Sequence, residues 1–319
     1  MAQKLSQNWG LLFLALAALC RSLCQTFVRT PPSAPWPLPQ ALRRWRQDFL
    51  SINHGLDPTG LVSSIFLGED KACPRPVLDL FRSMGLSHML AASGFNCWIV
   101  SQMLRLAARP MARALGGKVN RWDAIASVAG AGLFWCWSDQ SPPVTRALLT
   151  TLISATATTL GVRIPLPRLV ILQYCGSLVL DPRLFRHAGF QLTHACLLGL
   201  LAGEHYTRKW FPALPRWVAP SLGGSLGATL AALPITWAFF AELNFNGVLL
   251  TPLISPVVAA GLMPLALMQM FVLLLPHPWG DSIAQCLGQL NSIIAWFLLR
   301  VLELAQAVLP SLRYAPYWD

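Results

Sequence analysis

The sequence predicts an all-α, polytopic membrane protein with about nine spanning helices. Of its 319 residues, 55% are hydrophobic and 12% are charged, whereas an ordinary soluble domain carries about 25% charged residues. The mean hydropathy is strongly positive, at +0.51. Apolar runs long enough to cross a bilayer recur along the chain, with polar loops between them. A soluble globule is therefore the first class that the composition excludes.

The first apolar run covers residues 10–28 and is interrupted by Arg21. Such a run can be a signal peptide, a signal anchor or a first spanning helix. We favour an uncleaved helix, because the large Leu19 stands where a lipoprotein-type cleavage site needs a small residue.

Residues 29–85 are polar enough to leave the membrane, and they open with a Pro-rich spacer at 31–39. Apolar and basic residues then alternate at helical spacing. The apolar positions are Leu42, Trp45, Phe49 and Leu50, and the basic positions include Arg43, Arg44 and Arg46. This pattern predicts a basic amphipathic helix on the outer membrane surface. A second amphipathic segment, residues 76–84, follows. We therefore divide the chain into an N-terminal helix with this outer segment, residues 1–85, and a polytopic domain, residues 86–319.

Eight further apolar stretches complete the predicted spans. Seven begin near Leu86, Trp122, Val144, Pro165, Phe185, Trp217 and Asn246, and the last covers residues 283–310. One of them, residues 247–275, would exceed about 40 Å as a single helix, against a hydrocarbon core of about 30 Å. Three prolines within it, Pro252, Pro256 and Pro264, predict that this helix is broken.

Charge sets the predicted orientation. The chain carries 24 Lys and Arg against 13 Asp and Glu, a net charge of +11. Two short loops are rich in basic residues and should be cytoplasmic; they contain Arg105, Arg109, Arg113, Lys118, Arg121, Arg208, Lys209 and Arg216. The loop at 138–143 and the loop around Glu242 then fall outside, together with residues 29–85. The eight cysteines are scattered without a C-x-x-C pair, so we expect neither a disulfide framework nor a metal site.

Polar residues inside apolar helices are candidate functional groups, because burying them in a membrane is unfavourable. In the stretch after Gly85, His88, Ala92 and Asn96 would share one helix face, with Ser93 about 60° from Asn96. The alternative is helix packing, in which small polar residues let two backbones approach closely.

The stretch near Phe185 carries His187, Gln191 and His194 along one predicted face. These residues are too far apart along the axis for the two histidines to share a metal ion. A hydrated cavity lining is the better interpretation, although His187 can simply lie at the interface.

Arg146 lies about one turn inside the helix that Pro142 and Pro143 begin, with Ser141 as a candidate N-cap. Its side chain can snorkel to the membrane surface. Alternatively, it can bind phosphate near an outer entrance, since its planar fork of donors suits that ligand. Gly223, Gly227 and Ala231 form a small-residue ridge that predicts close helix packing.

Five ordered motifs resemble the ComEC competence-channel family, membrane proteins that pass single-stranded DNA into the bacterial cytoplasm. The first and most specific is Gly-Leu-Ser-His-Met-Leu-Ala-Ala-Ser-Gly at residues 85–94, preceded by Leu-Gly-Glu at 67–69. The others are Val-Thr-Arg-Ala at 144–147, the segment from Asp181 to Thr193, and Leu-Pro at 233–234 with Gly-Val-Leu-Leu at 247–250.

This resemblance implies a plasma-membrane channel for single-stranded DNA. His88, Ser93, Asn96, Arg146, Gln191 and His194 would line or brace its path, and Arg43, Arg44 and Arg46 would gather DNA outside. The expected partners are single-stranded DNA, membrane lipid, a separate cytoplasmic DNA motor and DNA-delivery proteins. No cofactor is expected. The sequence contains no Walker A motif, since Val119 follows Gly117-Lys118.

Two positions depart from the family pattern, which usually has His at position 96 and Asn at position 251, where this chain has Asn96 and Thr251. Full-length members also carry an outer oligonucleotide-binding barrel and a metallo-β-lactamase-like domain, which we do not expect in this chain. A non-transporting assembly partner is therefore one alternative. The other is an intramembrane serine hydrolase, with Ser93 as nucleophile and His194 as base.

Overall fold

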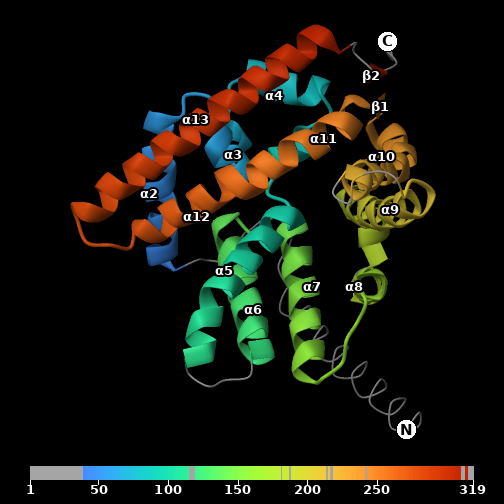
Figure 1. The fold of residues 1–319 in the computed structure, drawn as a ribbon, viewed down its shortest axis with the longest axis horizontal. Coiled ribbons are helices and arrows are strands. Elements are labelled where there is room, and N and C mark those ends of the chain that lie inside the picture. The colour runs from blue at the N-terminus through green and yellow to red at the C-terminus, as the bar shows by residue number, and fades with distance from the viewer. Residues whose placement is uncertain are drawn as a thin grey trace.

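The chain is helical almost throughout the computed structural model, which describes residues 39–114, 119–180, 182–186, 188–212, 215, 218–240, 243–309 and 313–314 (Figure 1). The predicted all-α class is confirmed with one small addition. Strands β1 (Leu243–Asn244) and β2 (Arg313–Tyr314) form a two-residue antiparallel pair. The first apolar run, at residues 10–28, lies outside the described residues.

Residues 40–89 form short helices that pack into the core of the molecule. In chain order they are α2 (Gln40–Leu56), α3 (Leu61–Leu67), the 3₁₀ turn η1 (Asp70–Ala72), α4 (Arg75–Ser83) and the 3₁₀ turn η2 (Ser87–Met89). The main hydrophobic cluster joins them to α5 (Gly94–Ala114), α11 (Asn246–Val257), α12 (Met263–Val272) and α13 (Trp279–Val308). The predicted division after residue 85 stays a prediction.

Helix α3 lies at the centre of this core, and all seven of its residues are buried. Two glycines in left-handed conformation, Gly60 (φ 66°) and Gly68 (φ 78°), bound the helix. The Asp57 carboxylate accepts hydrogen bonds from the backbone N–H groups of Thr59 (3.0 Å) and Val62 (2.8 Å). A carboxylate in this position satisfies N–H groups that the first turn of a helix leaves free.

Helix α2 is amphipathic as predicted, but its apolar face does not lie against lipid. Phe49 is fully buried, and the Trp45 indole N–H donates to the Met270 carbonyl oxygen of α12. The Trp45 ring also lies edge-on to Trp137, with 4.8 Å between centroids. The prediction of a surface-lying helix is therefore wrong for this face, because core residues of other helices cover it.

All eight apolar stretches after residue 85 form helices, although the first starts later than predicted. Helix α5 begins at Gly94 instead of near Leu86. The next helices are α6 (Val119–Trp137), α7 (Pro142–Thr159), α8 (Leu166–Leu180), the 3₁₀ turn η3 (Pro182–Arg186), α9 (Ala188–Trp210) and α10 (Val218–Phe240).

Helices α9 and α10 pack with their backbones in close contact. Gly199 and Gly203 of α9 face Gly227 and Gly223 of α10, so that a Cβ atom on any of the four would meet the partner helix. The predicted small-residue ridge on α10 is confirmed. Such ridges allow backbone approach and van der Waals contact where side chains would hold two helices apart.

Two helical segments among the described residues are long and apolar enough to cross a membrane, Asn246–Val272 and Trp279–Val308. In an apolar 18-residue stretch of each, about 28% of the residues are buried within the protein. Nine spans are not confirmed. Figure 1 also shows α11, α12 and α13 lying at an angle to α6 and α7, which differs from a bundle of parallel spans.

The Pro-rich segment Asn246–Val272 is continuous instead of broken. Between α11 and α12 it forms one π-helical turn, η4 (Val258–Leu262). With its amide oriented to satisfy both partners, Asn291 of α13 donates to the Leu262 carbonyl oxygen (3.2 Å) and accepts from the Ala266 N–H (3.1 Å). The irregular turn is stabilised by a neighbouring helix, as expected for a helix that contains proline in an apolar setting.

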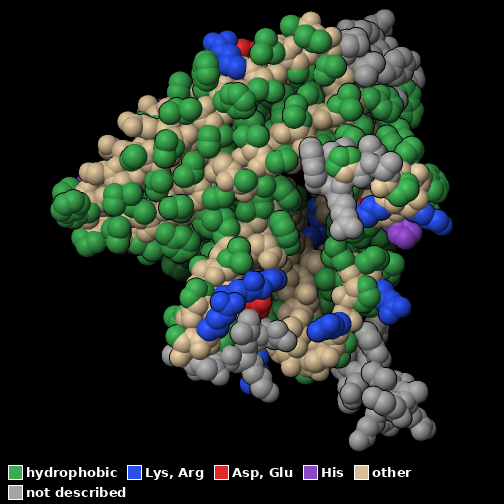
Figure 2. Space-filling view, viewed as in Figure 1, with side chains coloured by type: hydrophobic (Ala, Val, Ile, Leu, Met, Phe, Trp, Pro, Cys, Tyr) green, Lys and Arg blue, Asp and Glu red, His purple; other side chains and the backbone are tan. Residues whose placement is uncertain are grey.

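Segments predicted to lie on the same side of the membrane meet in the structure. Arg46 of α2 contacts Asp139 in the loop after α6, and Asn244 Nδ2 donates to the carbonyl oxygens of Arg82 and Ser83. At the opposite end of α5 and α6, Asp123 pairs with Arg105 and Arg109. Figure 2 shows basic side chains gathered around an acidic one there. These contacts show which segments are neighbours, and the side of the membrane that each faces stays a prediction.

Replacing Gly227 by Val should destabilise the protein, because its side chain would collide with the Gly199 carbonyl oxygen. We expect a loss of about 1–3 kcal/mol in the free energy of unfolding, as for other overpacked sites. Thermal unfolding in detergent, followed by tryptophan fluorescence, measures the change. Gly176→Ala on α8 is the control, since no atom lies within 4 Å of its added Cβ. Equal midpoints for the two variants would contradict this packing.

Candidate functional site

The motifs that resemble the competence-channel family meet at one junction in the core. A Cβ atom on Gly247 would lie 2.7 Å from the Gly85 carbonyl oxygen, and one on Gly68 would lie 2.7 Å from the Ala92 Cβ. Gly68 (φ 78°) and Gly85 (φ 71°) are also in the left-handed conformation. These segments therefore need glycine both for backbone conformation and for close approach.

The same junction extends to the helix that carries Arg146. A Cβ atom on Gly94, at the start of α5, would lie 3.5 Å from the Ala147 Cβ of α7. Ser93 precedes Gly94 and Arg146 precedes Ala147. The tertiary structure thus brings the predicted residues of α5 and α7 to neighbouring positions.

Ser93 and Asn96 form the N-terminal cap of α5. The Ser93 hydroxyl accepts from the Asn96 backbone N–H (3.2 Å) and donates to the Asn96 Oδ1 (3.1 Å). Asn96 Nδ2 donates to the Ile65 carbonyl oxygen of α3 (2.6 Å). These bonds satisfy free groups at the ends of two helices. Both side chains therefore position α5 against the central helix α3.

The predicted stripe of His88, Ala92 and Asn96 on one helix face does not form. Residues 87–89 are a 3₁₀ turn, residues 91–93 are non-helical, and the His88 side chain is exposed. The reason is local, since the Ser93 cap starts a new helix and competes with continuous helical bonding. His88 therefore does not share a helical face with Asn96.

Arg146 bridges α7 to α9. Its Nη2 donates to the Gly189 carbonyl oxygen (3.1 Å) and to the Thr193 hydroxyl, and its guanidinium lies 6.0 Å from the Phe190 ring centroid. Nε is buried without a hydrogen-bond partner. Among the described residues no carboxylate pairs with this half-buried cation. Ser141 occupies the predicted N-cap position of α7, but its side chain makes no capping bond.

His194 is buried in a polar and aromatic cluster between α8 and α9. Its Nε2 lies 2.6 Å from Gln173 Oε1, and its Nδ1 lies 2.8 Å from the Phe190 carbonyl oxygen. Gln173 Nε2 also donates to the Ser177 hydroxyl (3.2 Å). The Tyr174 ring stacks on Phe190 with 5.2 Å between centroids. Phe190 thus contacts both Arg146 and His194.

Two further predictions concern Gln191 and the Ser93–His194 pair. Gln191 Nε2 donates to the Phe185 carbonyl oxygen (2.7 Å), which ties α9 to the preceding turn. His187 lies outside the described residues.

Ser93 and His194 are hydrogen-bonded to different groups, namely Asn96 on one side and Gln173 and Phe190 on the other. The contacts described therefore do not form a serine–histidine pair.

The three basic residues predicted to gather DNA lie in different environments. Arg43 and Arg44 are exposed on α2. The Arg46 side chain is only 16% exposed, and its Nη2 lies 2.7 Å from both a Glu69 oxygen and an Asp139 oxygen. Two carboxylates therefore already neutralise Arg46, which leaves Arg43 and Arg44 as the cations that face solvent.

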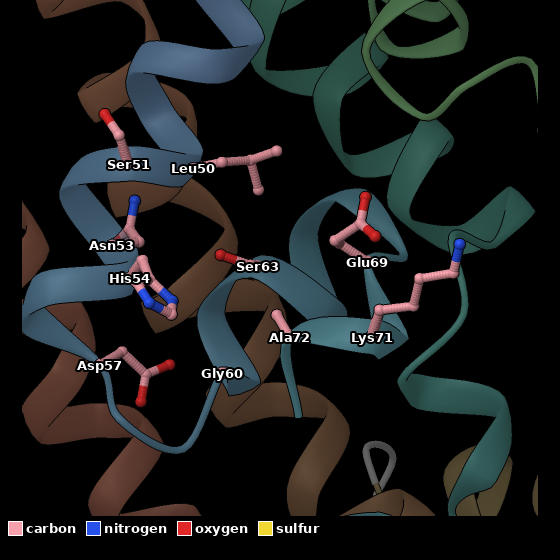
Figure 3. Close-up of a pocket in the computed structure, with 10 residues that line it drawn as sticks. All are labelled: Leu50, Ser51, Asn53, His54, Asp57, Gly60, Ser63, Glu69, Lys71 and Ala72. Carbon is pink, nitrogen blue, oxygen red and sulfur yellow. The ribbon is translucent and has the colours of Figure 1, made fainter. Parts of the chain in front are cut away.

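A surface pocket of about 430 Å³ lies between α2, α3 and η1 (Figure 3). It contains the carboxylates Asp57 and Glu69, which bind Val62 N–H and Arg46 respectively. His54 and Lys71 also line it. Within the described part of the chain, no group of three or more His, Cys, Asp and Glu residues is placed to hold a metal ion.

Sequence reasoning missed Gln173 and Thr193 as partners of the predicted residues. Gln173 was detectable in principle, because it is a polar residue within the apolar stretch 166–180. Thr193 carries no comparable signal, since a threonine in a helix commonly bonds to the carbonyl four residues earlier, as Thr193 does with Gly189 (2.7 Å).

The sequence is similar to known proteins over the region that carries these motifs. The sequence model of a family described as "Competence protein" matches residues 65–318. The chain is 24% identical over 247 residues to "ComE operon protein 3" of Bacillus subtilis (strain 168), an alignment that covers 74% of this chain and 30% of that relative. No solved structure gives a significant match.

Asn96→Ala should destabilise the protein, because it leaves the Ile65 carbonyl oxygen without its donor. An unpaired buried polar group costs about 1–3 kcal/mol. Unfolding of the purified variant in detergent measures this effect. Gln102→Ala on the same helix is the control, since that side chain is only partly buried. An Asn96→Ala midpoint equal to that of the control would show that the α3–α5 contact is unimportant for stability.

Proposed function

Because the chain belongs to the competence protein family, we propose that it acts in DNA uptake as a multi-pass protein of the bacterial plasma membrane that helps a single strand to cross. The family is membrane-associated, and two helices of this chain have the length and apolarity of spans. The chain aligns with about 30% of its Bacillus relative's length. Because the alignment covers only this part of the relative, DNA transport by this chain is itself a proposal.

The observation that carries the proposal is the guanidinium of Arg146. It is a half-buried cation without a carboxylate partner among the described residues, and its Nε is unbonded. An uncompensated charge away from water is unfavourable, so an anion at this position would be stabilised. The planar donors of arginine suit a phosphate oxygen pair. We therefore assign Arg146 the role of a contact for the DNA backbone.

The path of the strand would run along the junction of α7 and α9. Figure 2 shows a hollow between α11 and the α9–α10 pair, with basic side-chain atoms inside it. Arg146 bonds to α9 through Gly189 and Thr193. Movement of α9 relative to α7 would free these donors for phosphate. Ser93, Asn96 and His194 would brace the helices around this path, since each is already hydrogen-bonded to a neighbour.

The proposed partners follow from the chemistry of the chain. Single-stranded DNA is the polyanion, and a separate cytoplasmic motor would supply energy, because the sequence contains no Walker A motif. Separate proteins would deliver the DNA. Lipid would contact the exposed apolar side of α13, where Ile293 is 62% exposed and Leu304 is 67% exposed.

Arg146→Ala should reduce DNA uptake about tenfold or more, because hydrogen bonds to charged groups contribute roughly 1.5–3 kcal/mol. Uptake of labelled DNA by transformable cells with equal levels of the protein is the measurement. Arg121→Ala is the control, since Arg121 is exposed at the start of α6. Undiminished uptake would remove the phosphate role, and normal uptake after deletion of the whole chain would favour an assembly partner.

Reversing two charges on α2, with Arg43→Glu and Arg44→Glu together, should weaken DNA binding to the purified protein. The loss should shrink as salt rises, because counterion release drives such binding. Fluorescence anisotropy with a labelled single strand, at low and high salt, tests this. Gln47→Glu controls for added negative charge on the same exposed helix. A loss that is independent of salt would contradict the electrostatic role.

A further inference from the structure

The turn between α6 and α7 holds two consecutive residues in a backbone conformation that side chains disfavour. Asp139 has φ 49° and Gln140 has φ 57°. Both values lie in the left-handed region, where non-glycine residues are uncommon. A strained turn of this kind persists only when surrounding contacts stabilise it. The turn, residues 138–141, connects directly to the helix that carries Arg146.

Arg46 supplies these contacts from a distant part of the sequence. Its Nη2 donates to Asp139 Oδ2 (2.7 Å), and its Nε donates to the Trp137 carbonyl oxygen (2.8 Å) at the end of α6. The same Nη2 donates to Glu69 Oε2 (2.7 Å), and this second carboxylate fixes the guanidinium. One side chain thus binds both the helix end and the strained residue.

Residues 138–141 are also hydrogen-bonded to the first residues of α7. The Gln140 N–H donates to the Trp135 carbonyl oxygen (3.1 Å). The Thr145 hydroxyl lies within donating distance of the carbonyl oxygens of Gln140 (3.2 Å) and Ser141 (3.1 Å), and it accepts from the Trp135 indole N–H (2.9 Å). Thr145 is the residue before Arg146. Displacement of the turn would therefore displace Arg146.

We propose that Arg46 is a positioning residue: it holds Asp139 and Gln140 in the left-handed conformation and thereby sets the orientation of Arg146 toward α9. This inference rests on the proposed phosphate role of Arg146. It replaces the role of Arg46 as a cation that gathers DNA directly, because two carboxylates and a carbonyl oxygen occupy its donors.

Hydrogen–deuterium exchange of the purified protein tests the positioning without DNA. Arg46→Gln should accelerate exchange of the amides at residues 138–141 and 144–147 about tenfold, since it removes charge-assisted bonds. Asp139→Gly in the Arg46→Gln background should return exchange part of the way to the wild-type rate, because glycine adopts positive φ without strain at one of the two strained positions. Arg43→Gln is the matched control on the same helix. Unchanged exchange in Arg46→Gln would overturn the proposal.

Should Arg46→Gln fail to fold, Arg46→Lys and Asp139→Val provide a second test. Lysine keeps the charge but cannot bind Asp139 and the Trp137 carbonyl oxygen together in one planar geometry. Valine at position 139 disfavours positive φ. Both variants should accelerate exchange at residues 138–141 and 144–147, whereas wild-type rates in both would contradict the proposal.

DNA uptake by cells that carry the same variants at equal protein level separates this inference from the proposed function. Arg46→Gln should lower uptake, Asp139→Gly should partly restore it, and Arg46→Gln should add no further loss to Arg146→Ala. Altered exchange with normal uptake would support the positioning of the turn and contradict the phosphate role of Arg146. Lost uptake that Asp139→Gly does not restore, with unchanged exchange, would indicate that Arg46 binds DNA directly.

Discussion

The guanidinium of Arg46 joins three segments that are remote in sequence, and the arrangement of the core depends on this bridge. It binds Glu69, Asp139 and the Trp137 carbonyl oxygen. Glu69 follows Gly68, and Gly68 packs against Ala92 just before α5. Asp139 lies in the loop just before α7. Removing this cation would leave two carboxylates facing each other and a helix end without its donor. Such losses cost more than a surface ion pair contributes.

Close backbone contact organises the rest of the junction. Gly85 meets Gly247, Gly68 meets Ala92, and Gly199 and Gly203 meet α10. Each contact brings together segments that a Cβ atom would separate. The motifs that resemble the competence family are therefore in large part sites of close backbone packing. Arg146 lies beside them and has no carboxylate partner among the described residues, which is why it carries the proposed function.

Several buried polar side chains among the described residues have individual partners. Asn96 binds α3, His194 binds Gln173, and Asn291 binds the π-helical turn of α11–α12. Satisfied polar groups specify how helices pack, because each alternative packing would leave them unbonded. A hydrated path for a strand would thus require helices to separate and some of these bonds to break. At the α7–α9 contact, the bonds that would break are those that Arg146 donates to Gly189 and Thr193.

Much of the architecture follows from local sequence. The eight apolar stretches form helices, the ridge of Gly223 and Gly227 packs closely, and Arg43 and Arg44 are exposed, because periodicity and residue size act over a few neighbouring positions. Only the tertiary structure decided that α2 buries its apolar face in protein, that α5 begins at Gly94, and that Arg46 binds carboxylates. These outcomes depend on partners up to 225 residues away in sequence, such as Met270 for Trp45. A residue's own neighbours in the chain carry no record of such partners, since the packing of the whole chain determines which groups come into contact.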